Sequence, residues 1–166
     1  MCRYEHGFWW PNLAESDYDS VGAGQGAGHN VNIPLNVTGN TDTDYLHAWH
    51  QVGGVQVTVM LTVPQVVLPV ATEYSPQLIL VSAGYDPALG CPEGEQEVSP
   101  ATFAHLTHSL GCVARAGGGR VCCVLEGGYF PASLAEGAAL TLRQLLGDPC
   151  PELPRPATTR PNPHME

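Results

Sequence analysis

The sequence predicts an α/β fold built on a parallel β-sheet, and three observations support this. Residues 78–84 and 120–125 are two apolar runs of strand length. A segment with helical periodicity, residues 99–114, lies between them. Apolar runs of this length that alternate with helices are typical of parallel strands buried on both faces. We therefore expect a β-α-β unit with its two strands side by side.

The helices around this unit have recognisable ends. Ser99 and Pro100 stand where a helix N-cap and first turn favour them, so a helix is expected to begin there. A second helix is expected over residues 133–146, because Gly147 and Pro149 then stop the helical pattern.

The first half of the chain has weaker signals. A glycine-rich run, residues 22–28, leads into an alternating stretch, residues 29–34, that predicts a short strand. A dinucleotide-binding loop is disfavoured, because no buried strand precedes the glycines and no helix follows them. The glycines are instead expected to let backbone segments pass closely. Residues 41–50 predict a helix capped at Thr41, and residues 66–71 begin another that runs to Ser75.

Residues 52–65 conflict with their surroundings. The helix that begins near Thr41 should continue, yet this stretch is uncharged, β-branched and opened by two glycines, a composition that belongs to strands. From Pro149 to Glu166 the chain holds six prolines and no apolar periodicity, which predicts a disordered tail over residues 151–166. The folded domain is expected over residues 1–150.

Composition narrows the classes of function. The chain has 166 residues, 43% of them hydrophobic, which is enough for one packed core, and 19 Gly with 15 Pro indicate many loops. Six Lys plus Arg against 16 Asp plus Glu give a net charge of -10. This balance excludes direct nucleic-acid binding and would suit a cationic substrate, although solubility alone also explains it. No leader or membrane span is recognisable, so a cytoplasmic or nuclear protein is expected, with no membrane partner. The six cysteines form no C-x-x-C pair and are expected to be reduced.

The chemically distinctive residues follow the two predicted strands. Asp86 comes just after the first, and Glu126-Gly-Gly-Tyr129 ends the second. Ligands of open parallel sheets bind outside the carboxyl ends of the strands, so a carboxylate and a phenol are expected at one crevice. An aspartate at a strand end is by itself more often a turn former.

The motifs around these residues resemble the histone deacetylase family, in particular its class IIb members. The resemblance rests on these segments: Arg3-Tyr-Glu-His-Gly7, Trp9-Trp-Pro11, Glu15-Ser-Asp17, 21–26, Ser82-Ala-Gly-Tyr-Asp86, Pro92-Glu-Gly94, Phe103-Ala-His-Leu-Thr107, Leu125-Glu-Gly-Gly-Tyr129 and Leu146-Gly-Asp-Pro149. It runs in order from residue 3 to about residue 150. It implies the C-terminal half of the arginase/deacetylase fold, a partial three-layer sandwich.

The resemblance also implies a zinc site and a role for several residues. Asp86 matches one of three zinc ligands, and Tyr129 matches the tyrosine that hydrogen-bonds the oxyanion. Gly128, with Gly127, would let Tyr129 swing towards the substrate. Trp10 matches an aromatic wall of the substrate tunnel, with a core or interface tryptophan as the alternative. Glu93 matches a gatekeeper carboxylate that attracts a secondary ammonium, with a solvated loop residue as the alternative.

The substrate implied is an acetyl-polyamine or an acetyl-lysine in proteins such as histones. Pro92-Glu93-Gly94 and residues 118–129 favour the polyamine-deacetylating type over the microtubule-directed one. Cys91 departs from the family, which usually has aspartate there. His105 and His108 are three residues apart but have no matching role, and are expected to be structural.

The family's tandem histidines and its Asp-x-His ligands precede the motif with which this sequence begins. The chain would then supply one zinc ligand of three, and we expect it to be inactive alone and prone to aggregation at unpaired strand edges. Deleting residues 52–65 restores the family pattern, so this segment is interpreted as an unspliced intron or alternative exon. Two alternatives to an enzyme fragment remain: a catalytically dead interaction module and an unrelated nucleotide-binding α/β protein.

Overall fold

The computed structural model describes residues 13–35, 37–49 and 66–154. The chain falls into two compact units, Met1–Thr38 with Asn162–Glu166, and Gly39–Pro161. Trp10, the segment 52–65 and most of the proline-rich tail lie outside the described residues, so the predictions made for them stay predictions. Within the described part of the chain, no helix is long and apolar enough to cross a membrane.

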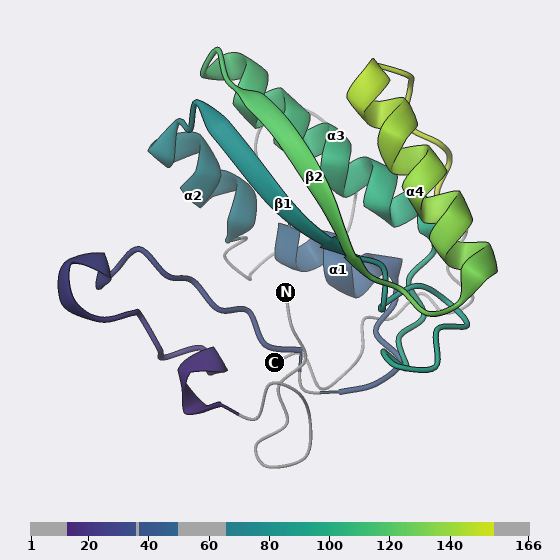
Figure 1. Cartoon of the computed structure of the whole chain (residues 1–166), viewed down its shortest axis with the longest axis horizontal. Helices are drawn as coiled ribbons and strands as arrows, with labels where there is room; N and C mark the ends of the chain where they lie inside the picture. Colours follow the sequence, from purple (N-terminus) through teal and green to yellow (C-terminus); the bar gives the residue numbers. More distant parts are fainter. Residues whose placement is uncertain (1–12, 36, 50–65, 155–166) are drawn as a thin grey trace. The chain divides into compact units, whose positions relative to one another are not determined.

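The second unit contains the β-α-β arrangement that the sequence predicts (Figure 1). Its elements are α1 Asp42–Trp49, α2 Val67–Tyr74, β1 Leu78–Gly84, α3 Pro100–Ala116, β2 Arg120–Gly127 and α4 Pro131–Leu146. The two strands are parallel, with Leu78 beside Arg120 and Ala83 beside Leu125. The α/β class is therefore confirmed, and β2 runs two residues further than the sequence indicated.

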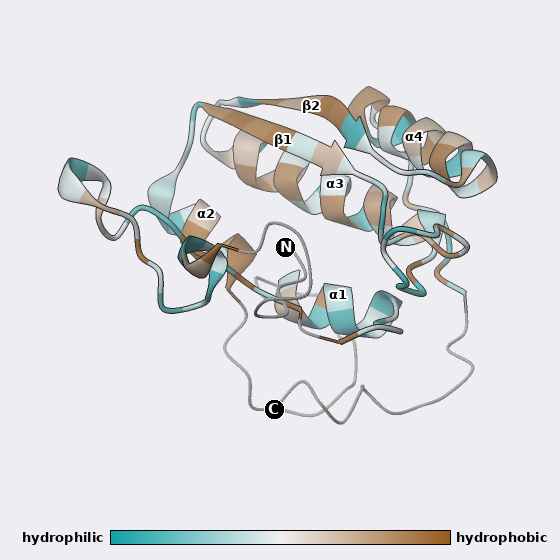
Figure 2. Ribbon diagram, turned by 60° about the horizontal axis from the view of Figure 1, so that its bottom comes forward, coloured by the Kyte–Doolittle hydropathy of each residue, from teal (hydrophilic) through white to brown (hydrophobic). Residues whose placement is uncertain are grey.

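The expectation that both strands are buried on both faces is wrong. Exposure alternates along β1, and Leu78, Leu80 and Val124 are 55%, 69% and 53% exposed. The reason is that α3 packs on one side of the strands, and the other described helices gather on that same side, as Figure 2 shows. Among the described residues of the second unit, nothing covers the opposite face of the two strands, although both strands are strongly apolar.

The core lies between the sheet, α3 and α4. Tyr85 is its central side chain: its ring meets that of Phe103 with centroids 4.8 Å apart. Glycine at position 137 permits this packing, because a Cβ there would lie 2.8 Å from the Tyr85 ring. Val98 and Ala104 are fully buried beside them. The core is thus built around the residue that precedes Asp86.

The predicted helix ends are confirmed at Thr41, Ser99 and Gly147, although the Ser99 side chain takes no part in its cap. Thr41 donates from its backbone N–H and its hydroxyl to Asp44 at 2.8 and 2.9 Å, as in a capping box. Gly147 ends α4 in the left-handed region, at φ 95°. Ser99 has N-cap backbone angles, but its side chain makes no capping bond. Its backbone N–H donates instead to Asp42, at 2.6 Å.

The described part of the first unit is a loop with two short 3-10 helices, Ala14–Ser16 and Gly24–Gly26. The strand predicted over residues 29–34 does not form as an element, since the described backbone there has β pairing at Pro34 alone. Side-chain amides hold this loop instead: Asn32 donates to the carbonyls of Glu15 and Asp17 at 2.8 and 3.0 Å. The glycines were expected to permit close backbone contacts. This is confirmed at Gly22, where a Cβ would lie 3.0 Å from the carbonyl oxygen of Gly26. A Cβ at Gly24 or Gly28 would meet nothing within 4 Å, and positive φ explains these two residues.

Candidate functional site

Asp86 stands immediately beyond β1, where the strands of the sheet end. Its carboxylate lies over the last residues of both strands: a Cβ at Gly127 would be 2.6 Å from Oδ1 and 2.8 Å from Oδ2. A Cβ at Gly84 would be 3.0 Å from Oδ2. Real Cβ atoms do not come within 3.0 Å of other heavy atoms. Any larger residue at position 127 would therefore force this carboxylate to move.

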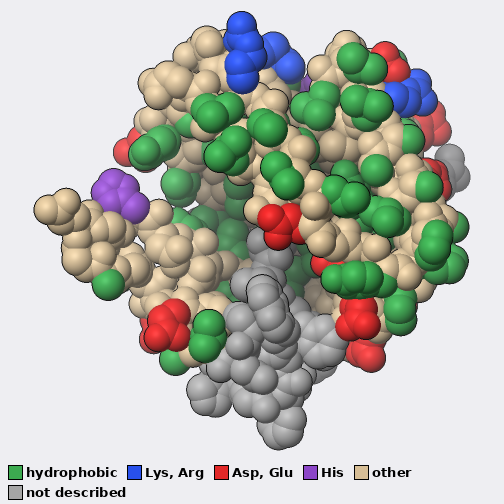
Figure 3. Space-filling model, in the orientation of Figure 1, with side chains coloured by type: hydrophobic (Ala, Val, Ile, Leu, Met, Phe, Trp, Pro, Cys, Tyr) green, Lys and Arg blue, Asp and Glu red, His purple; other side chains and the backbone are tan. Residues whose placement is uncertain are grey.

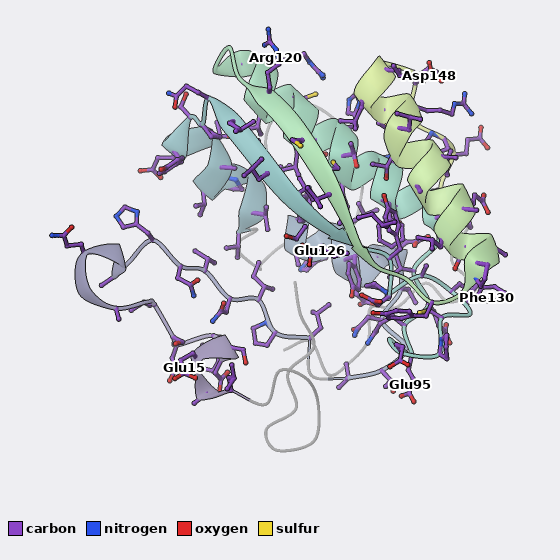
Figure 4. All side chains as sticks on the ribbon, viewed as in Figure 1. Glu15, Glu95, Arg120, Glu126, Phe130 and Asp148 are labelled. Carbon is purple, nitrogen blue, oxygen red and sulfur yellow. The ribbon has the colours of Figure 1, made fainter. Side chains whose placement is uncertain are left out.

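A β-bulge produces this arrangement. The register passes from Ala83 beside Leu125 to Gly84 beside Gly127, which leaves Glu126 as the extra residue. Glu126 is exposed at the carboxyl end of β2 (Figure 4). The bulge thus brings a glycine, and not a glutamate, opposite Gly84 and under Asp86.

Tyr85 fixes the backbone beneath the site. Its N–H donates to the carbonyl of Gly127 at 3.0 Å, and its hydroxyl donates to Thr141 of α4 at 2.9 Å. Burial raises the pKa of the phenol above its ordinary value. A Cβ at Gly128 would lie 2.8 Å from the Cβ of Tyr85, so the turn after β2 packs directly on this residue.

Tyr129 leaves this turn with its side chain 59% exposed. Gly128 before it has φ 120°, a conformation that side chains rarely allow. The backbone N–H of Tyr129 donates to the sulfur of Cys91, at 3.4 Å. The turn is therefore tied down at its backbone, while the phenol is accessible to a ligand.

The loop between β1 and α3 carries Glu93 and folds back on Asp86. A Cβ at Gly94 would overlap the carbonyl oxygen of Asp86, at 2.2 Å. The side-chain oxygen of Gln96 accepts from the backbone and side-chain nitrogens of Asn40, at 2.8 and 2.9 Å, and both residues are buried. Glu93 is exposed at the tip of a loop that is anchored on either side.

Charge is unevenly distributed over this unit. The described arginines lie at the other end of the sheet: Arg120 begins β2, while Arg115 and Arg143 lie in the last turns of α3 and α4. Figure 4 places Arg120 and Glu126 at opposite ends of β2, and Figure 3 shows basic side chains along one border of this face. The site end carries acidic residues: Asp86, Glu93, Glu95, Glu97 and Glu126. No Lys or Arg occurs between residues 4 and 114. This end of the unit favours a cationic ligand.

Asp86 has the properties of one ligand of a metal site. Its Oδ1 is buried and receives no hydrogen bond from the described residues. A buried carboxylate oxygen without a partner is costly, and a cation would satisfy it. Within the described ranges, however, no group of three or more His, Cys, Asp and Glu side chains could hold a metal ion. Asp86 therefore fits zinc as a single donor, and the described residues do not complete the donor set.

The structure brings Asp86, Gly127 and Gly128 together, with Glu93 on the adjoining loop. His105 contacts the carbonyl of Pro151 at 2.9 Å, which agrees with a structural role. The supporting polar residues were not foreseen: Tyr85, Thr141, Asn40 and Gln96. Each acts through a contact between positions 56 residues apart, so no local sequence pattern indicates it.

The sequence of this chain is similar to those of known deacetylases. A model of the histone deacetylase domain matches residues 2–145. Human polyamine deacetylase HDAC10 is 49% identical over 154 residues, which are 93% of this chain and 20% of that protein. Histone deacetylase 6 of Caenorhabditis elegans is 39% identical over 87% of this chain and 13% of its own length.

Solved structures agree with these matches. The structure of the histone deacetylase Clr3 superposes with a TM-score of 0.80 at 35% identity, over 97% of this chain and 24% of that one. The HDA15 HD domain gives a TM-score of 0.73 at 33% identity, over 88% of this chain and 36% of that one. The chain spans about a fifth of the length of its curated polyamine deacetylase relatives.

Proposed function

The chain belongs to the histone deacetylase domain family, and from that premise we propose that it forms part of a zinc-dependent amide hydrolase acting on acetyl-polyamines or on acetyl-lysine in proteins. The observation that carries the proposal is the Asp86 carboxylate, which has a buried oxygen without a hydrogen-bond partner among the described residues. It lies beside the Gly-Gly-Tyr turn at the carboxyl ends of parallel strands. Ligands of open α/β sheets bind at this place, where a carboxylate can bind a metal and a phenol can donate to an oxyanion.

Asp86 would be one of the zinc ligands. Zinc, when bound, polarises the scissile carbonyl and makes water a better nucleophile at neutral pH. Tyr129 would donate a hydrogen bond from its hydroxyl to the carbonyl oxygen as negative charge develops there. The packed Gly127-Gly128 backbone would hold the turn, while the exposed phenol reaches the substrate.

Acetyl-polyamines suit this chain better than neutral peptides. Their secondary ammonium groups are cationic, and Glu93 is exposed in an acidic loop without a nearby Lys or Arg in the sequence. A carboxylate in this position would attract such a group. The high identity to polyamine deacetylases supports the same substrate class.

We further propose that the 166-residue chain alone does not hydrolyse these substrates, because the described residues offer zinc the single donor Asp86. The experiment measures zinc-dependent acetate release from N-acetylspermidine and from an acetyl-lysine peptide. It compares the chain with the full-length product of its gene. Activity of the full-length product that chelation abolishes is expected, with N-acetylspermidine preferred. Equal rates on both substrates would overturn the polyamine assignment, and an active isolated chain would overturn the proposed inactivity.

A second candidate function is a catalytically dead interaction module in the cytoplasm or nucleus. The exposed apolar face of β1 and β2 favours it, since Leu78, Leu80 and Val124 could contact another protein. A full-length gene product that releases no acetate, with or without zinc, would favour this module over the enzyme.

A further inference from the structure

The thiol of Cys91 lies where the Glu93 loop meets the Tyr129 turn. It is 5% exposed, and its sulfur accepts the hydrogen bond from the backbone N–H of Tyr129 at 3.4 Å. The backbone N–H of Cys91 donates to the carbonyl of Ala88 at 3.0 Å, so the residue that carries this thiol is itself held in place. The contact joins two segments that are 38 residues apart in the sequence.

A second contact joins the same two segments at the next residue. Gly90 has φ 87°, and a Cβ there would lie 2.8 Å from the ring of Phe130. Two consecutive loop residues thus meet two consecutive turn residues, one pair through a hydrogen bond and the other through close packing. Phe130 is also the N-cap of α4, so the turn cannot shift without moving the start of that helix.

The loop is fixed at its other end as well. Gly39 donates its backbone N–H to the carbonyl of Glu95 at 2.8 Å, and Gln96 is bound by the buried Asn40. Glu93 therefore stands between two anchors, one at residues 90–91 and one at residues 94–96. Movement of the first anchor would change the position of Glu93 relative to Tyr129.

We propose that Cys91 is a positioning residue that fixes the Tyr129 turn against the Glu93 loop. It does not contact the substrate, and it acts by giving the Tyr129 amide a buried acceptor. This inference rests on the proposed function, in which Tyr129 and Glu93 contact the substrate. The thiol is well suited to the position, because a sulfur acceptor tolerates a long hydrogen bond in an apolar setting where a charged acceptor would be costly.

The test measures hydrogen exchange of the Tyr129 amide in the 166-residue chain, residue by residue, by NMR. Replacing Cys91→Ala removes the acceptor and is expected to accelerate exchange at Tyr129 about five-fold, the size of one net hydrogen bond. Cys91→Ser retains an acceptor and is expected to recover part of the protection. Cys122→Ala, at an exposed cysteine on β2, is the matched control and should leave Tyr129 unchanged.

Exchange at Ala104 in α3 separates a local effect from global destabilisation, because this residue is fully buried. The proposal is overturned when Cys91→Ala accelerates Tyr129 and Ala104 by the same factor, or leaves Tyr129 within two-fold of the unmodified chain. If the Cys91→Ala chain does not fold, exchange in the unmodified chain is the test. A Tyr129 amide that exchanges there as fast as in an unstructured peptide overturns the proposal. Hydrogen exchange at Tyr129 and at Ala104 needs neither zinc nor substrate. The result can therefore be interpreted even if the deacetylase assay shows no activity.

Activity of the full-length gene product gives a second readout. Because Tyr129 is proposed to act on the oxyanion, Cys91→Ala is expected to lower kcat about five-fold with KM for N-acetylspermidine little changed. Cys91→Ser is expected to restore part of kcat. A change confined to KM would contradict the proposed action through Tyr129.

Discussion

Replacing Gly127 by alanine should destabilise the chain through one identifiable contact. The new Cβ would lie 2.6 Å from Oδ1, 2.8 Å from Oδ2 and 3.0 Å from Cγ of Asp86, where favourable contacts are about 3.5–4.0 Å. Overpacking of this kind costs about 1–3 kcal/mol in free energy of unfolding. The φ of Gly127 is not in the left-handed region, so backbone strain adds nothing. Gly26→Ala is the matched control, because its Cβ would meet nothing within 4 Å.

A double-mutant cycle with Asp86→Ala identifies the source of that cost, since alanine lacks all three contacting atoms. Urea unfolding followed by circular dichroism gives the free energies of the four chains. We expect Gly127→Ala to cost less than about 0.5 kcal/mol in the Asp86→Ala background. Asp86→Ala alone should be neutral or stabilising, because it removes a buried oxygen without a described partner. Additive effects, or a loss of more than about 1 kcal/mol for Asp86→Ala, would refute the reasoning and make Asp86 a structural residue.

Three further outcomes follow from the described contacts. Because burial raises the pKa of Tyr85 from its ordinary 10.0, there is a pH range above 10 in which the folded chain keeps the phenol proton and the unfolded chain has lost it. This stabilisation is complete below pH 10 and is lost as the pH rises through the folded-state pKa; urea midpoints of the chain and of Tyr85→Phe should diverge above about pH 10, and parallel curves would contradict this. Thr141→Val should cost about 1–3 kcal/mol in unfolding by urea, and much less in a Tyr85→Phe background, since phenylalanine has no hydroxyl to donate to residue 141. Leu80→Lys should reduce aggregation measured by light scattering while changing stability by no more than about 0.5 kcal/mol, because Leu80 is 69% exposed; unchanged aggregation would exclude this face as its cause.

The sequence predicted the elements of the second unit well because their signals are local. The apolar run 78–84 and the helix ending at Gly147 agree with β1 and α4. Burial was predicted less well, because it depends on what packs on each face, and the described helices gather on one side of the strands. Ser99 shows a similar limit. It is the N-cap that the sequence predicts, but its side chain makes no capping hydrogen bond, and the distant Asp42 carboxylate accepts its backbone N–H.

The site was predictable only in its chemistry-bearing residues. Asp86 and Tyr129 were singled out because they follow strands and lie in motifs that resemble the deacetylase family, and their roles stay predictions. The residues that place them depend on contacts between distant segments: Thr141 meets Tyr85, and Gln96 meets Asn40. Cys91 departs from the family pattern in the sequence, yet its contact with the Tyr129 amide emerges from the fold alone.

The bulge at Glu126 explains why two glycines follow it. A regular parallel ladder that pairs Ala83 with Leu125 would continue with Gly84 beside Glu126. A Cβ at the position opposite Gly84 comes within 2.6 Å of the Asp86 carboxylate, so a glutamate there would displace it. The extra residue moves Glu126 out and brings Gly127 in, and Gly128 then turns at φ 120° to start the tyrosine turn. The carboxylate at position 86 therefore accounts for Gly127, and the packing of the turn on Tyr85 accounts for Gly128, which links the two strand ends whatever ligand they hold.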